Sequence, residues 1–336
     1  MNADLHNEVK SLPPIAQFIL TRRIPCAGLA LVMFTAAVWG SALTGIPALA
    51  FLVSLMGLTL HMLTPALFAL IVFGGGLIYA LQVAAIAALA VVVITDFNLM
   101  SGAVFLLLYA ALPALAATSL TRIAGLQQSA QRLALGLFLA TMTALLAGAA
   151  SQGVSMHLFV EQMIEPLFSG VTSSIPVGEV AALDALEQTK RMTAWVLPGF
   201  TAFSLWMVWW LDVILARRIA VNYGFYRGDH SEMLMIRFDR VAGMTFLAAA
   251  ALANVMDGSV QYIAISIAIM LGGLLALQGV SVAHLWIRAR GMRVTLVVMY
   301  LLLLIWSAMV LPFIIVGLLD IWFDFRRNSV SANGEE

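Results

Sequence analysis

The stretch PALFALIVFGGGLIYALQVAAIAALAVVV, residues 65–93, contains no charged residue. It belongs to an apolar block that runs from residue 46 to residue 95, whereas a helix crosses a membrane with roughly 20 residues. The block is therefore too long for one span and is predicted to hold two. Proline and glycine inside such helices indicate kinks or a broken helix. A loop near 61–65 is the favoured division, and a re-entrant segment is the alternative.

The composition of the whole chain agrees with a membrane protein. Hydrophobic residues make up 62% of the chain and charged residues 10%, whereas soluble domains carry about 25% charged residues. Lipid offers no partner to an open strand, and the apolar blocks do not alternate as barrel strands do. The sequence predicts an all-α, polytopic transmembrane helical bundle of eight or nine spans with short interfacial amphipathic helices. The other apolar blocks are 24–44, 103–120, 133–151, 193–216, 241–256, 260–287 and 294–318.

Arginine in the short loops predicts the orientation of the helices. The loops 121–132, 217–240 and 288–293 are rich in arginine and are predicted to be cytoplasmic, whereas the acidic segment 152–192 is predicted to lie outside. This assignment gives nine spans and an external carboxyl terminus, and eight spans with a cytoplasmic tail is the alternative. The predicted regions are a cytoplasmic segment 1–23, membrane helices 24–151, the external loop 152–192, membrane helices 193–327 and a disordered tail 328–336.

Two amphipathic helices are predicted in the external loop. In HLFVEQMIEPLF (157–168), apolar residues recur at helical spacing at Val160, Met163, Ile164 and Leu167. In EVAALDALEQTKR (179–191), Glu187 and Arg191 are four residues apart and can pair on one helix face. The loop is interpreted either as a lid over a pocket or as an interfacial connector.

The apolar chain closes on PFIIVGLLDIWFDFRR, residues 312–327. A helix over 317–328 has an apolar stripe of Leu318, Ile321, Trp322 and Phe325. Asp320 and Asp324 lie on the opposite side of that helix. This pattern predicts an amphipathic helix at the membrane interface, whose two aspartates pair with the arginines of 288–293 if the two ends meet.

A second polar pattern occurs in QGVSVAHLWIRARGMR, residues 278–293. Polar side chains in membrane helices usually face the interior of the bundle or a cavity. The stripe is interpreted either as interhelical hydrogen bonding or as a ligand or proton site. Its residues are Gln278, Ser281, His284 and Arg288.

Together these two stretches resemble the carboxyl-terminal signature of the DUF2232 (YybS-like) family of bacterial membrane proteins. The resemblance covers about the last fifty residues, with Gln278, Gly279 and His284 followed by a basic turn, an apolar span and Gly317, Asp320, Trp322, Asp324, Phe325 and Arg326. It implies a multi-pass protein of the bacterial cytoplasmic (inner) membrane. More distantly, it implies the fold of the substrate-binding S components of energy-coupling-factor vitamin transporters. The family has no settled activity.

A third group of candidate residues lies in WMVWWLD, residues 206–212. Trp206, Trp209 and Trp210 recur at helical spacing, and Asp212 follows them. The tryptophans are interpreted either as an aromatic belt at the membrane interface or as a stacking platform for a flat ligand. Asp212 is an acid within a predicted span, unless it lies at the interface.

Motifs for chemistry are missing from the sequence. It contains no GxxxxGK[ST], HExxH, CxxC or GxSxG motif, and its five histidines show no metal-ligand spacing. No catalytic residue, metal or cofactor is therefore predicted, an enzyme is not expected, and the net charge of zero gives no indication of a nucleic-acid partner. The first hypothesis is a small-molecule binding or transport subunit in the lipid bilayer, driven by protein partners. The alternative is a membrane scaffold or regulator whose partners dock on the loop 217–240 and the tail.

Overall fold

The computed structural model describes residues 11–42, 47–121, 125–172, 180–228, 230 and 236–326. Every element in these ranges is a helix, which confirms the all-α prediction. The predicted disordered tail 328–336 and the first ten residues of the predicted cytoplasmic segment lie outside the described residues.

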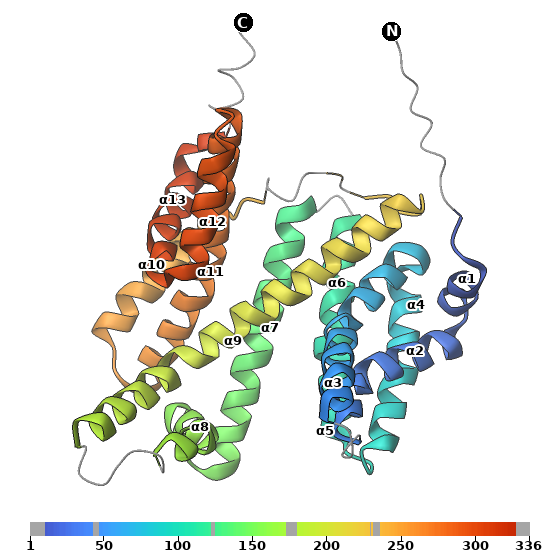
Figure 1. Ribbon diagram of the computed structural model, residues 1–336, viewed down its shortest axis with the longest axis horizontal. Helices are drawn as coiled ribbons and strands as arrows, with labels where there is room; N and C mark the ends of the chain where they lie inside the picture. Colours follow the sequence, from blue (N-terminus) through green and yellow to red (C-terminus); the bar gives the residue numbers. More distant parts are fainter. Residues whose placement is uncertain are drawn as a thin grey trace, which may run out of the picture. The chain divides into compact units, whose positions relative to one another are not determined.

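The chain forms two compact units, which are described separately (Figure 1). Unit 1 comprises Met1–Leu137 and Trp206–His230, and unit 2 comprises Phe138–Leu205 and Ser231–Glu336. In unit 1, α4 packs against α2, η2 and α6. Its elements are α1 (Pro14–Thr21), α2 (Arg23–Thr35), the 3-10 helix η1 (Ala36–Ala42), α3 (Pro47–Met62), α4 (Thr64–Ile94), α5 (Leu99–Val104), the π-helix η2 (Phe105–Ala111) and α6 (Leu112–Thr121).

Two long helices contribute to both units, and the other elements of the chain belong to unit 2. In unit 2, α11 packs against α10 and, most extensively, against α13. The shared helices are α7 (Gly125–Gln152) and α9 (Val180–Asn222). The elements of unit 2 alone are α8 (Met156–Thr172), α10 (Arg240–Val255), α11 (Gly258–Ala289), α12 (Arg293–Ile305), the 3-10 helix η4 (Ser307–Met309) and α13 (Val310–Phe323).

Several helices are long and apolar enough to cross a membrane. In the described part of the chain, length and composition give five such spans, or seven if each of two bent helix pairs counts as one span. The predicted number of eight or nine spans is therefore not confirmed. The five spans are Pro47–Ile94, Leu99–Thr121, Gly125–Gln152, Val180–Asn222 and Gly258–Ala289, and the bent pairs are Pro14–Thr21 with Arg23–Trp39 and Arg293–Ile305 with Val310–Phe323.

The first long apolar block is broken at its triple glycine. Leu63 alone separates α3 from α4, and the Leu67 N–H still donates to the Leu63 carbonyl (3.3 Å). The predicted loop near 61–65 is therefore replaced by a nearly continuous helical path. The helical dihedrals are instead interrupted at Gly76, with φ 80° and ψ 171°. Glycine adopts a positive φ without the steric penalty that a Cβ imposes, which explains why the break lies there.

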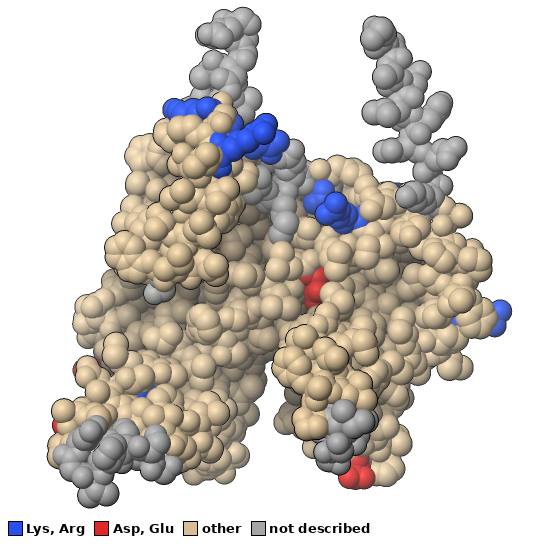
Figure 2. Space-filling view, viewed as in Figure 1, with Lys and Arg blue, Asp and Glu red and all other residues tan. Residues whose placement is uncertain are grey.

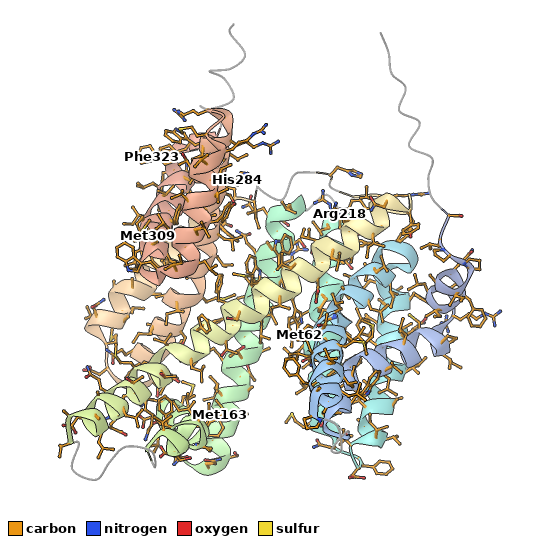
Figure 3. The ribbon with its side chains drawn as sticks, viewed as in Figure 1. Met62, Met163, Arg218, His284, Met309 and Phe323 are labelled. Carbon is orange, nitrogen blue, oxygen red and sulfur yellow. The ribbon has the colours of Figure 1, made fainter. Side chains whose placement is uncertain are left out.

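The predicted amphipathic helix of the external loop is α8. It buries Val160 and Ile164, whereas Met163 (labelled in Figure 3) and Leu167 are exposed, so the predicted apolar stripe is divided between two surfaces. The buried side chains form an apolar cluster with Ala149, Met156, Ala194 and Tyr262.

The predicted second helix of the external loop is the first part of α9, which continues without interruption to Asn222. The predicted pair forms there, with the Arg191 Nε 3.4 Å from the Glu187 Oε1. Lys190 also bridges Glu187 (3.3 Å) and Glu165 of α8 (2.6 Å). These ion pairs join α8 to the start of α9.

Helix α13 runs beside α11 in the same direction. Three contacts advance together along both helices, which indicates that the helices are parallel. The neighbouring pairs are Gly272 with Ile314, Leu275 with Gly317, and Gln278 with Asp320. The carboxyl end of α13 therefore lies toward the carboxyl end of α11.

Helices α12 and α13 form a hairpin. They have 13 and 14 residues, about 20 Å each, which is shorter than the roughly 30 Å hydrocarbon core of a bilayer. They are bent by 117° at their junction. Figure 3 shows Phe323 and His284 toward one end of this bundle and Met309, at the junction, further along it. Helix α13 returns toward the end from which α12 starts. The hairpin therefore places the carboxyl-terminal tail on the same side as the turn 290–292, whereas the nine-span prediction places it on the opposite side.

We therefore expect Phe323 and Arg290 to be accessible from the same side of the membrane. Single cysteines at Phe323, Arg290 and Asp257 are introduced with Cys26→Ser, because Cys26 is the only cysteine in the chain. A membrane-impermeant maleimide, applied to intact and to permeabilised cells, is expected to label Phe323→Cys and Arg290→Cys alike and Asp257→Cys with the opposite sidedness. Labelling of Phe323→Cys together with Asp257→Cys would contradict the hairpin.

Candidate functional site

Two glycines bring the backbones of α11 and α13 into direct contact. A Cβ on Gly279 would meet the carbonyl oxygen of Phe313, and a Cβ on Gly317 would meet the carbonyl oxygen of Leu275. Small residues allow close approach of helices in membranes, where packing rather than the hydrophobic effect drives association. Each glycine of the sequence signature is thus required by the backbone of the other helix.

Next to this crossing, Gln278 links α11 to two other segments. Its Nε2 donates to the Asp320 Oδ2 (2.8 Å), and its Oε1 accepts a hydrogen bond from the Phe238 N–H (2.8 Å). Asp320 also accepts a hydrogen bond from the Phe325 N–H on its Oδ1 (3.1 Å). Gln278 and Asp320 are completely buried, so these bonds supply the partners that water cannot.

Two arginines balance the charges of the two aspartates. The Arg326 Nε lies 3.4 Å from the Asp320 Oδ2, and the Arg237 Nη1 donates to the Asp324 Oδ2 (2.9 Å). The Arg237 Nη2 also donates to the carbonyl oxygens of Asp320 (3.4 Å) and Ile321 (3.1 Å). These carbonyls lie in the last turn of α13, where a cation is favourable. We call Gln278, Asp320, Asp324, Arg237 and Arg326 the signature network.

The signature network corrects the predicted environment of Asp320. The interfacial helix predicted over 317–328 places this side chain on a polar outer face, but in the structure it is buried against α11. The helix itself ends at Phe323, and Asp324 follows with a left-handed φ of 47°. A carboxylate inside the bundle is stable only when it is paired and hydrogen-bonded, which explains why so many groups converge on it.

The predicted pairing of the aspartates with the arginines of 288–293 is also wrong. Arg290 lies twelve residues beyond Gln278 on the path of α11, which corresponds to about 18 Å along a helix. The carboxyl end of α13 meets α11 at Gln278, so the turn is out of reach. Arg290 instead lies over the ring of Trp286, with its Cζ 3.5 Å from the ring centroid. Figure 2 shows basic atoms gathered at this end of unit 2.

The predicted polar stripe along α11 does not form one site. Gln278 belongs to the signature network, whereas the Ser281 hydroxyl donates to the Leu277 carbonyl of its own helix (2.9 Å). The His284 Nδ1 lies 2.9 Å from the Tyr300 hydroxyl of α12, and Arg288 is exposed (Figure 3). Interhelical hydrogen bonding therefore accounts for Gln278 and His284, and no described contact joins all four residues.

The three predicted tryptophans are packed inside unit 1. Trp206, Trp209 and Trp210 are at most 1% exposed, and the rings of Trp206 and Trp210 stack with centroids 6.1 Å apart. The Trp206 Nε1–H donates to the Ala130 carbonyl of α7 (3.0 Å). Their burial agrees with a packing role and leaves no open aromatic surface at these three residues.

Trp209 satisfies a carbonyl group that the π-helix leaves without a backbone donor. The Leu112 N–H donates to the Leu107 carbonyl, five residues earlier. In the same i→i+5 pattern, the Leu108 carbonyl would accept a hydrogen bond from the N–H of residue 113. Pro113 has no N–H, and the Trp209 Nε1–H donates to the Leu108 carbonyl instead (2.6 Å). The ring of Trp209 also contacts Tyr109, with centroids 5.2 Å apart.

Asp212 lies one helical turn beyond Trp209 on α9. It is only 5% exposed, and in the described part of the chain its Oδ2 has no hydrogen-bond partner. It also has no ion pair with any described residue. Asp212 therefore differs from Asp320. Asp320 has several described partners, whereas the Oδ2 of Asp212 has none among the described residues.

Two contacts are not predicted by the sequence patterns. Arg237 lies in the arginine-rich loop 217–240, and His61 lies within the apolar block 46–95. His61 contacts Tyr109 across unit 1, with its Nε2 2.8 Å from the hydroxyl. The available signal was a polar residue within an apolar stretch, but a single sequence does not reveal which helix provides its partner.

The helices and the buried ion network define a multi-pass helical membrane protein. The chain belongs to the DUF2232 family, described as a predicted membrane protein, whose family model matches residues 41–321. This match includes Gln278, Gly279, Gly317 and Asp320 and confirms the family resemblance. No curated protein and no solved structure matches the chain.

Asp320→Asn is expected to destabilise the protein far more than Asp324→Asn. Asp320→Asn leaves the buried Arg326 without its nearest carboxylate, and the loss of one partner of a buried pair typically destabilises by about 3 kcal/mol. The Arg237–Asp324 pair is about one-third exposed, so its loss is expected to change the free energy of unfolding by less than about 1 kcal/mol. Detergent-induced unfolding followed by circular dichroism measures both, and equal effects would contradict the assigned roles.

Proposed function

We propose that this protein is a membrane-embedded subunit that binds or transports a small molecule in a bacterial cytoplasmic membrane. Partner proteins supply the energy, and the chain itself acts without a cofactor and without enzymatic chemistry. The observation that carries the proposal is the buried carboxylate of Asp212, whose Oδ2 has no partner among the described residues.

The position of Asp212 makes its charge unfavourable unless something pairs with it. It lies ten residues before the end of α9 at Asn222, about 15 Å along the helix. A charged side chain deep in a bilayer raises the free energy by several kcal/mol, so such residues usually mark a site for a substrate or an ion. A ligand with a cationic or hydrogen-bond-donating group would supply the partner that Asp212 lacks.

The surroundings of Asp212 suit such a ligand. Tyr109 is half-buried and contacts the ring of Trp209, one turn before Asp212. Trp209 itself is buried, so of these two aromatic groups only Tyr109 retains exposed surface for a ligand. Aromatic faces attract cations, and ligand sites combine apolar walls with a few polar groups. The break in α4 at Gly76 adds a discontinuous helix to the same unit, a feature that recurs near transporter sites.

The proposed role of partner proteins rests on the absence of a nucleotide-binding motif from the sequence. The chain carries no phosphate-binding loop, so energy from nucleotide hydrolysis must come from another subunit. The distant resemblance to S components favours the same division of labour, because in those transporters a separate subunit binds the substrate. This support is an analogy of fold and not of site.

A membrane scaffold or regulator is the second candidate. The signature network supports it, because its aspartates and arginines pair with one another and are not aimed at a ligand. The exposed arginines Arg240, Arg288, Arg290 and Arg293 would then dock an acidic partner protein. This function needs no buried unpaired acid, so Asp212 distinguishes the two candidates.

Asp212→Asn is expected to raise the melting temperature of the ligand-free protein by several degrees. The substitution removes a buried acid that the described chain does not pair, and residues kept for function are often unfavourable for stability. Thermal unfolding of the detergent-purified protein measures the change, and Asp257→Asn, at an exposed helix end, is the matched control. A clear fall in melting temperature for Asp212→Asn would show that Asp212 stabilises the fold and would remove the main support for the proposal.

The same purified proteins distinguish the two candidate functions. Mass spectrometry of proteins that copurify in mild detergent is expected to find a membrane coupling subunit and an ATPase. A panel of small amines is then expected to raise the melting temperature of the wild type but not of Asp212→Asn. Copurification of envelope or division proteins without an ATPase, and no response to amines, would favour the scaffold.

A further inference from the structure

His61 lies between two hydrogen-bond partners inside unit 1. It precedes Met62, the last residue of α3, which is labelled in Figure 3. Its Nδ1 lies 2.5 Å from the Phe34 carbonyl oxygen of α2, and its Nε2 lies 2.8 Å from the Tyr109 hydroxyl of η2. The ring also contacts those of Phe34 and Tyr109, with centroids 5.2 and 5.0 Å away.

The chemistry of these partners fixes the proton positions in neutral His61. A carbonyl oxygen only accepts hydrogen bonds, so the Nδ1 must carry the hydrogen. The Nε2 then has a free lone pair and accepts a hydrogen bond from the Tyr109 hydroxyl. Neutral His61 therefore presents a basic nitrogen whose only described partner is a tyrosine hydroxyl.

We propose that the Nε2 of His61 is a proton-binding site and that Tyr109 transmits its charge state to the π-helix. When the Nε2 takes up a proton from water, it becomes a donor, and the Tyr109 oxygen must accept from it. The Tyr109 hydroxyl hydrogen then turns away toward another acceptor. One proton is gained, one hydrogen bond reverses direction, and no covalent bond other than the new N–H is formed.

The π-helix gives this reversal a structural consequence. Segments with i→i+5 hydrogen bonds are rare, and they occur frequently at functional sites. Tyr109 lies within the seven-residue π-helix η2, next to Leu108, whose carbonyl is bound by Trp209. The rings of Tyr109 and Trp209 are in contact, with centroids 5.2 Å apart, so a change at the Tyr109 hydroxyl is expected to alter the environment of the indole. Asp212 lies one turn beyond Trp209 on the same helix.

The elements packed around His61 bring few other titratable groups. The helix η1 has none, α2 has Arg23 and Cys26, and α4 has Tyr79, whose hydroxyl donates to the Leu20 carbonyl (3.0 Å). Arg23 and Cys26 precede Phe34 by eleven and eight residues, about 16 and 12 Å along a helix. From η2 only Tyr109 faces His61, and from α9 the nearest such group is Asp212, beyond Trp209.

A second histidine–tyrosine pair in the chain provides a matched control. The Nδ1 of His284 on α11 lies 2.9 Å from the Tyr300 hydroxyl on α12, and no described hydrogen bond joins the His284 ring to a backbone carbonyl. Tyr300 lies on an ordinary α-helix. Protonation of His284 is therefore not expected to reach Trp209.

The experiment is a pH titration of the full chain in lipid nanodiscs, with nitrogen-15 in the histidine and tryptophan side chains. Five histidines are present, and His61→Gln, His284→Gln and Trp209→Phe assign the relevant NMR signals. As the pH is lowered, the His61 Nε2 signal is expected to change from that of a nitrogen with a free lone pair to that of a nitrogen that carries a hydrogen. The Trp209 indole signal is expected to move with the same midpoint as the His61 signal. The titration needs no ligand other than the proton.

Substitution of each tyrosine tests the transmission. In Tyr109→Phe, His61 is expected to titrate while the Trp209 signal no longer follows, whereas Tyr300→Phe is expected to leave both signals unchanged. An Nε2 of His61 that gains no proton at any pH at which the protein stays folded, or a Trp209 signal that does not follow it in the wild type, would overturn the proposal. Because no small-molecule ligand is used, either result is independent of the proposed ligand site at Asp212.

Discussion

The contact between α11 and α13 at Gly279 and Gly317 is the constraint on which the end of unit 2 depends. With no side chain at either residue, the two backbones touch, and Gln278 reaches Asp320. The two helices run parallel through this contact, and α13 returns toward the end of α11. A Cβ at either glycine would separate the helices, and the buried carboxylate of Asp320 would lose its neutral partner.

The burial of Asp320 explains why hydrogen-bond donors and an arginine converge on this end of α13. A carboxylate in an apolar bundle requires hydrogen-bond donors and a counter-ion, which Gln278, the Phe325 N–H and Arg326 provide. Asp212 has no comparable set of partners among the described residues. Asp320 is thus paired within its own unit, whereas the proposed function assigns the partner of Asp212 to a ligand, which separates structural roles in unit 2 from the proposed functional roles in unit 1.

Local patterns were sufficient to predict the helices, because apolar block length and helical spacing depend on nearby residues alone. The family signature likewise identified Gln278 and Asp320 as important, although not as partners. Their pairing depends on a crossing of α11 and α13 that no local pattern specifies. The same limit applies to Arg237, which comes from a loop 83 residues before Asp320. The sequence patterns favour a break near 61–65 rather than at Gly76, because proline and glycine both interrupt apolar blocks. Only the backbone dihedrals show which of these residues breaks the helix.

A double-mutant cycle of Gly317→Ala and Gln278→Ala tests the central claim most directly, with free energies of unfolding measured in detergent. In the wild type, Gln278→Ala is expected to destabilise by about 1 to 3 kcal/mol, because Asp320 loses a buried partner. In the Gly317→Ala background the same change is expected to have little further effect, because the helices are already apart. Gly170→Ala, at a site with nothing within 4 Å of the added Cβ, is the control and is expected to preserve the full effect. Additive effects of Gly317→Ala and Gln278→Ala would contradict the claim that the glycine contact makes the hydrogen bond possible.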